Sequence, residues 1–138
     1  MVHAVVDASV IASWFLPNEE KGKYEGVLNS VDRITIHVPS IFEYEFMNIL
    51  LNAEKKKRLD NATAQDILEI ISHYPIAVEP STAVLIENIN VFKMARAYDL
   101  TAYDAAYLEL AVRLNVPLLT YDKSLFDAAI RLKLRTIL

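Results

Sequence analysis

The chain has 138 residues, 54% of them hydrophobic, and its 18 acidic and 14 basic side chains give a net charge of −4. This size predicts one compact domain over residues 1–138, and the absence of cysteine excludes disulfides, thiolate metal sites and a cysteine nucleophile. The acidic balance argues against a general, charge-driven binder of nucleic acid, and the lack of a signal segment or an 18-residue apolar run predicts a cytoplasmic protein without a membrane span.

The first half of the chain predicts strands that alternate with helices. An apolar strand at residues 3–6 stops at Asp7, and Ser9 is suited to cap a helix at residues 10–15. A short helix at 23–29 then leads to alternating apolar residues, which predict a strand at 34–38.

The same alternation continues to the end of the chain. Ser40 is suited to cap a helix to about residue 57, and Thr63 with Asp66 resembles a capping box for a helix to about residue 73. The remaining expected elements are a strand at 76–78, helices at 82–98 and 102–114, a strand at 117–121, a helix at 125–132 and a strand at 135–138. This pattern predicts an α/β fold, a three-layer α/β/α sandwich with a parallel sheet.

Two acidic residues directly follow apolar strands. Asp7 closes the first strand, and Asp122 follows LLTY near the end of the chain. In open α/β sheets, ligands bind beyond the carboxyl ends of the strands. An unpaired carboxylate there would be costly to desolvate, and a bound cation would remove that cost.

Two further acids lie inside predicted helices among apolar neighbours. Asp104 shares a helix face with Tyr107 and Leu108, and Glu45 shares one with Asn48. Any one of these acids alone is well explained by pairing with a nearby base. If all four converge, their repulsion would raise their pKa values unless a divalent metal neutralised them.

The ligand chemistry narrows the choice of metal. An all-oxygen set without cysteine favours Mg²⁺ or Mn²⁺ over Zn²⁺. The three histidines, His3, His37 and His73, are scattered along the chain, and we interpret them as structural or surface residues.

Four motifs, in order along nearly the whole chain, carry a family resemblance. They are VVDASVI, PSIFEYEFMNIL, LTAYDAAYLELA and LLTYDKSL. Together they resemble the PIN-domain family, specifically the VapC-like toxin ribonucleases of toxin–antitoxin pairs. The resemblance implies a Mg²⁺- or Mn²⁺-dependent endoribonuclease that acts on RNA, forms a homodimer and is inhibited by a cognate antitoxin.

The resemblance also assigns roles to positions. It implies that the acidic cluster, which would hold the metal and carry out catalysis, consists of Asp7, Glu45, Asp104 and Asp122. Ser9, Thr120 and Asn48 match its supporting hydroxyl and amide positions. Glu43 is the less favoured alternative to Glu45, because it lies on another side of the helix. We expect an antitoxin to place a basic side chain, preferably arginine, into this acidic pocket.

Substrate binding would need basic residues near the site. Lys21, Lys23, Lys123 and the run at 55–58 are the candidates, although a solvated helix end explains the run better.

Three other functions compete with the nuclease. A phosphate-accepting signalling module would need paired acids after the first strand, and a phosphatase would need a second Asp where Ser9 stands. A catalytically silent interaction module would need exposed apolar side chains, for which Trp14 and Phe15 are candidates unless they pack in the core.

Overall fold

The computed structural model describes residues 2–17, 22–29 and 31–135 with the exception of 81–87. The strands are β1 (Val2–Val6), β2 (Ile34–Val38), β3 (Ile76–Val78) and β4 (Leu118–Leu119). The helices are α1 (Ala8–Ser13), α2 (Glu25–Asn29), α3 (Phe42–Lys55), α4 (Asn61–Ser72), α5 (Ile89–Tyr98), α6 (Ala102–Leu114) and α7 (Lys123–Arg131), with short 3₁₀ turns η1 (Gly22–Tyr24) and η2 (Val31–Arg33).

The four described strands form one parallel sheet in the order β3-β2-β1-β4. From β1 the chain steps through β2 to β3 on one side and later returns to place β4 on the other side of β1. The strand order therefore reverses between β1 and β4, and such a reversal is where open α/β sheets bind ligands.

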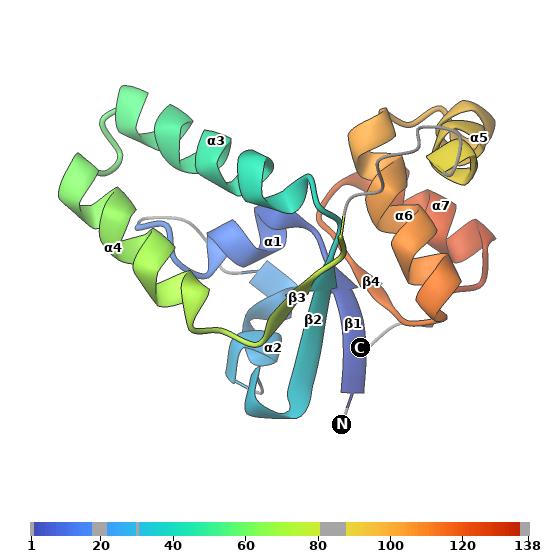
Figure 1. Cartoon of the computed structure of the whole chain (residues 1–138), viewed down its shortest axis with the longest axis horizontal. Helices are drawn as coiled ribbons and strands as arrows, with labels where there is room; N and C mark the ends of the chain where they lie inside the picture. Colours follow the sequence, from blue (N-terminus) through green and yellow to red (C-terminus); the bar gives the residue numbers. More distant parts are fainter. Residues whose placement is uncertain (1, 18–21, 30, 81–87, 136–138) are drawn as a thin grey trace.

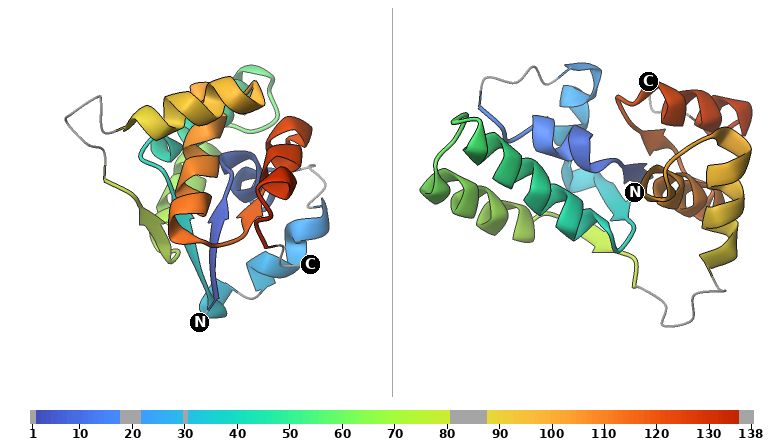
Figure 2. Two further views of the ribbon diagram at one scale, coloured as in Figure 1. Left: turned by 90° about the vertical axis from the view of Figure 1, so that its right-hand side faces the viewer. Right: turned by 90° about the horizontal axis from the view of Figure 1, so that it is seen from above.

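Helices cover both faces of this sheet, as predicted. Helices α1, α3 and α4 lie on one side and α5, α6 and α7 on the other (Figures 1 and 2). The last three residues of β1 are fully buried, because this strand is covered on both faces, whereas β2 alternates between buried and half-buried residues. No described helix has the length and apolar character needed to cross a membrane.

The predicted helix caps were wrong in three places. Ser9 lies inside α1, whose N-cap is Asp7, and α3 begins after Ile41 without the predicted cap from Ser40. Helix α4 is capped by Asp60, whose carboxylate accepts a hydrogen bond from the backbone N–H of Thr63 at 2.8 Å. At the starts of α1 and α4, neighbouring residues have side chains suited to capping, and the sequence does not say which adopts the cap geometry. The N-cap position of α3 is Ile41, whose side chain cannot cap.

Other boundaries also differ from the prediction. The expected helix at 82–98 is described from Ile89 onward, and residues 82–87 of that prediction lie outside the described residues. The strand after α6 is only two residues long, and three of the four residues of the predicted final strand lie outside the described chain. Trp14 is 4% exposed, so it belongs to the core and offers no surface to a partner.

Candidate active site

Asp7 lies at the carboxyl end of β1, where β1 adjoins β4. The residue is only 7% exposed. Its Oδ2 accepts hydrogen bonds from Thr120 Oγ1 at 2.9 Å and from Ser9 Oγ at 3.3 Å. Burial raises the pKa of Asp7 above its ordinary value, although these two hydroxyl groups act in the opposite direction. The carboxylate is thus fixed in orientation but desolvated.

Asp122 follows β4 and is the N-cap of α7. Its Oδ1 accepts a hydrogen bond from the backbone N–H of Leu125 at 2.8 Å. The backbone N–H of Asp122 donates to Thr120 Oγ1 at 3.0 Å. One buried hydroxyl, that of Thr120, therefore contacts both acids that follow the adjacent strands.

Glu45 and Asp104 lie in the first turns of α3 and α6. Glu45 Oε1 accepts a hydrogen bond of 2.8 Å from the hydroxyl group of Tyr107. The backbone N–H of Asp104 donates to the side chain of Thr101, the N-cap of α6, at 3.1 Å. Helices α3 and α6 lie in opposite layers (Figure 1), so Glu45 and Asp104 belong to opposite sides of the sheet.

Electrostatic interactions join the four carboxylates. The pKa of Glu45 is raised by burial and further by the charges of Asp7 and Asp104. The pKa of Asp104 is raised by burial and further by the charges of Asp7 and Asp122. Each acid therefore interacts with at least one other, and the structure brings all four predicted acids into one region.

The described part of the chain supplies no cation to this cluster. Its ion pairs join Arg113 to Glu79 and Glu109, and Lys123 to Asp127; none includes a cluster acid. The acids lie at or near the starts of helices, where the helix dipole favours negative charge. The charge repulsion between them nevertheless remains.

The donor set fits a hard divalent cation, because it consists of carboxylate oxygens alone. In three of the acids, Asp7, Glu45 and Asp122, a protein group donates to one carboxylate oxygen, and such bonds typically orient metal ligands. However, no three described His, Asp or Glu side chains are grouped closely enough to hold a metal as they stand. Electrostatic interactions act over longer distances than metal coordination does. The four acids are therefore close enough to affect one another's charge but do not form a complete coordination shell.

Of the other predicted residues, some contact the acidic cluster and others do not. Ser9 and Thr120 both contact Asp7, whereas Asn48 and Glu43 are exposed on α3. The basic run at 55–58 is exposed at the far end of α3, about 15 Å along the helix from Glu45. Lys123 pairs with Asp127. Lys21 and the side chain of Lys23 lie outside what the structure describes.

Two residues have roles in the site that were not predicted from the sequence. Thr101 caps α6 through the pattern Thr-x-x-Asp, which ends at Asp104 and was available in the sequence. Tyr107 was noted only as a helix-face neighbour of Asp104. Its bond to Glu45 spans 62 positions, and no local pattern signals it.

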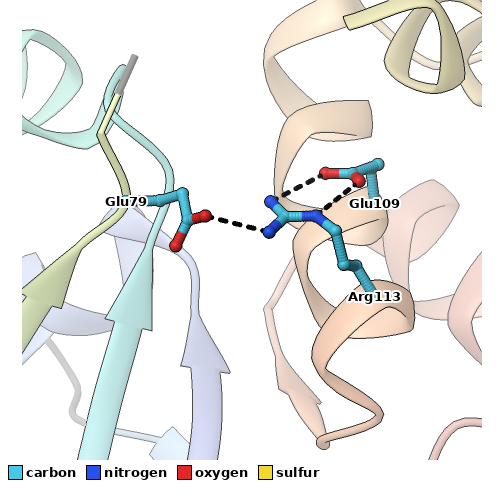
Figure 3. A network of polar contacts seen from close by, with 3 residues as sticks. All are labelled: Glu79, Glu109 and Arg113. Carbon is cyan, nitrogen blue, oxygen red and sulfur yellow. Dashed lines mark hydrogen bonds and ion pairs between the residues drawn. The ribbon is translucent and has the colours of Figure 1, made fainter. Parts of the chain in front are cut away.

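A separate cavity of about 630 Å³ lies between the connection from β2 to α3 (residues 39–41), the segment after β3 and helices α5 and α6, and none of the four acids lines it. Beside it Arg113 of α6 donates to Glu79, after β3, at 2.9 Å and to Glu109 at 2.8 Å (Figure 3). This network ties the edge of the sheet to α6. The candidate site is thus defined by the convergence of acids and not by the cavity.

The sequence is similar to that of known proteins. Residues 4–131 match the sequence model of the PIN domain. The chain is 30% identical over 124 residues to Ribonuclease VapC3 of Pyrobaculum aerophilum, covering 89% of this chain and 92% of that protein.

Two solved structures share the fold. PAE2754 from Pyrobaculum aerophilum superposes with a TM-score of 0.68 at 23% identity, covering 92% of this chain and 84% of the other. FitAcB from Neisseria gonorrhoeae superposes with a TM-score of 0.62 at 15% identity, covering 92% and 93%.

Proposed function

The chain belongs to the PIN-domain family, and we propose that it is a metal-dependent endoribonuclease, the toxin of a toxin–antitoxin pair. The observation that carries this function is the convergence of four carboxylates, without a basic partner among the described residues, where the strand order reverses. Ribonuclease VapC3, the 30% identical relative, supports RNA as the substrate.

In this proposal the four acids hold Mg²⁺ or Mn²⁺. Asp7 and Asp122 are the most direct ligands, Asp104 completes the site, and Glu45 acts directly or through water. When bound, such a cation lowers the pKa of a water molecule and stabilises the charge of the attacked phosphate. The chain's own contribution is to fix the carboxylates: Thr120 and Ser9 orient Asp7, and the N-cap bond orients Asp122.

The competing functions have less support. A phosphate-accepting module or an aspartyl phosphatase requires a second acid close to Asp7 in the chain, and the nearby Ser9 donates a hydrogen bond to Asp7 instead. A silent interaction module has no need for the desolvated carboxylates of Asp7, Glu45 and Asp104, which cost folding free energy in the absence of a cation.

The test is cleavage of a mixed structured and unstructured RNA pool by purified protein. Wild type should cut with Mg²⁺ or Mn²⁺ and stop with EDTA, and Asp7→Asn should lose at least 100-fold in rate. Asp66→Asn, an exposed acid on α4, is the matched control and should cut normally. Cutting that persists in Asp7→Asn would contradict the assigned site, and failure of wild type to cut any RNA would contradict the function.

The expected partners follow from the same proposal. The chain forms one domain and pairs as a homodimer, and a separate antitoxin inserts a basic side chain among the carboxylates. Light scattering should give twice the monomer mass. An antitoxin identified by co-purification should lose affinity when its inserted arginine is changed to alanine, and retained affinity would refute this mode of inhibition.

A further inference from the structure

Tyr107 is completely buried in α6, and its hydroxyl group has a charged partner. The residue is 0% exposed, and its hydroxyl donates to Glu45 Oε1 at 2.8 Å. Burial raises the pKa of Tyr107, and Glu45 raises it further, so the phenol remains protonated and acts as a donor over the whole working range of pH. A buried hydroxyl bonded to a carboxylate is a strong and directional contact.

This hydrogen bond joins the two layers of the sandwich at the acidic cluster. Glu45 belongs to α3 and Tyr107 to α6, on opposite sides of the sheet (Figure 1). Asp104 lies one turn before Tyr107 on α6, and its charge interacts with that of Glu45. Helix α6 therefore supplies one acid of the cluster and, one turn later, the group that holds another.

The hydrogen bond restricts one of the two oxygens of Glu45. A glutamate has three rotatable side-chain bonds, and an unrestrained one would lose more rotamer entropy when it binds a cation. With Oε1 bound to Tyr107, the carboxylate is partly ordered before any ligand arrives. Within the described chain, Oε2 has no hydrogen-bond or ion-pair partner, so it is available to a ligand.

We propose that Tyr107 is a positioning residue that pre-orders Glu45 for divalent-cation binding. The inference rests on the proposed function, because it takes the acidic cluster as the cation site. Loss of a hydrogen bond that orients a metal ligand typically lowers metal affinity 10- to 100-fold. We therefore expect Tyr107→Phe, which removes only the hydroxyl, to weaken Mn²⁺ binding by about 10-fold.

The test is calorimetric titration of purified protein with Mn²⁺ in the absence of RNA. The variants are Tyr107→Phe, Glu45→Ala and the double variant; Tyr74→Phe is the control, because Tyr74 packs on Phe15 away from the cluster. The proposal expects weaker binding in Tyr107→Phe, no further loss when it is added to Glu45→Ala, and unchanged binding in Tyr74→Phe. RNA cleavage by Tyr107→Phe should recover at saturating Mn²⁺, a recovery that a merely structural role would not produce.

The outcomes separate this inference from the function on which it rests. Equal Mn²⁺ affinity in wild type and Tyr107→Phe, with wild type still cutting RNA, would overturn the role of Tyr107 alone. Absence of both Mn²⁺ binding and RNA cleavage in wild type would overturn both proposals. If Tyr107→Phe does not fold, the ¹³Cδ resonance of Glu45 in wild type serves instead. It should shift on addition of Mg²⁺, and an unchanged resonance would refute the proposal.

Discussion

At the scale of single residues, Thr120 holds two acids of the cluster at once. The residue is 1% exposed, and its hydroxyl group donates to Asp7 and accepts from the backbone N–H of Asp122. Thr120→Val keeps the shape of the side chain but leaves both partners without their bond. We expect unfolding free energy to fall by about 1 to 3 kcal/mol and Mn²⁺ affinity to fall about 10-fold.

Urea unfolding and Mn²⁺ titration measure these two losses. Thr120→Ser is the control, because it retains the hydroxyl group and should bind Mn²⁺ within a few-fold of wild type. A valine variant with normal Mn²⁺ affinity would show that the hydroxyl group does not orient the site.

Individual residues differ in how far the sequence predicts their roles. Asp7 and Asp122 follow apolar strands, and the geometry of parallel sheets places such residues on one edge. Ser9 and Thr120, which the family resemblance predicts as supporting residues, both donate to Asp7. Tyr107 differs, because its partner Glu45 is determined by how α3 and α6 pack across the sheet.

At the scale of secondary-structure elements, the two glycines of the chain should respond oppositely to alanine. Gly22 has φ +63°, and an added Cβ would lie 2.7 Å from Tyr121 Oη, whereas Gly26 lies in α2 with nothing within 4 Å of an added Cβ. Gly22→Ala should therefore destabilise the fold by about 1 to 2 kcal/mol. Gly26→Ala should stabilise it by about 0.5 to 1 kcal/mol.

Each glycine variant is the control for the other, since the chemical change is the same. Urea unfolding monitored by circular dichroism should give midpoints on opposite sides of wild type. Two midpoints that shift in the same direction would mean that the backbone conformation at residue 22 does not determine how the alanine substitution changes stability.

The network around Arg113 should matter little to the site. Arg113 is 46% exposed and Glu79 is 38% exposed, and solvent-screened ion pairs contribute about 0 to 1 kcal/mol. Arg113→Ala should lower unfolding free energy by no more than about 1 kcal/mol and leave Mn²⁺ affinity unchanged. A large loss of Mn²⁺ affinity in calorimetry would mean that the position of α6 depends on this network.

Element types were predicted better than element boundaries. Apolar periodicity determines which segments become strands and helices, and Ala102–Leu114 matches the predicted helix closely. The starts of α1 and α4 were misassigned, because neighbouring residues compete for the cap, and α3 begins after Ile41 without any side-chain cap.

At the scale of the whole molecule, alternation of strands and helices predicts the layered fold, but not the strand order. The position of β4 beside β1 depends on which crossover packs best and leaves no local pattern. That position brings Asp122 next to Asp7, so the site depends on a property of the fold that the sequence pattern does not specify.

The same arrangement predicts how stability depends on pH and metal. The pKa of Asp104 is raised in the folded state, first by burial and then by the charges of Asp7 and Asp122. Above the ordinary aspartate value of 3.8 the folded state therefore binds more protons at this residue than the unfolded state, and its contribution to stability falls as pH rises. His37, whose pKa is lowered first by burial, contributes in the opposite sense near pH 6.5. A comparison of wild type with a variant is therefore needed to separate the contribution of Asp104 to stability from that of His37.

Asp104→Asn removes one charge from the cluster and leaves His37 in place. Without metal at pH 7.5 we expect this variant to melt a few degrees above wild type, and this advantage should shrink as pH falls and Asp104 of wild type becomes protonated. Mn²⁺ at 100 times its dissociation constant should stabilise wild type by about 2.7 kcal/mol and the variant by less, which reverses their order. Thermal melts in EDTA and in Mn²⁺ measure both effects. If wild type is the more stable protein without metal at pH 7.5, repulsion between the carboxylates is not what the cation relieves.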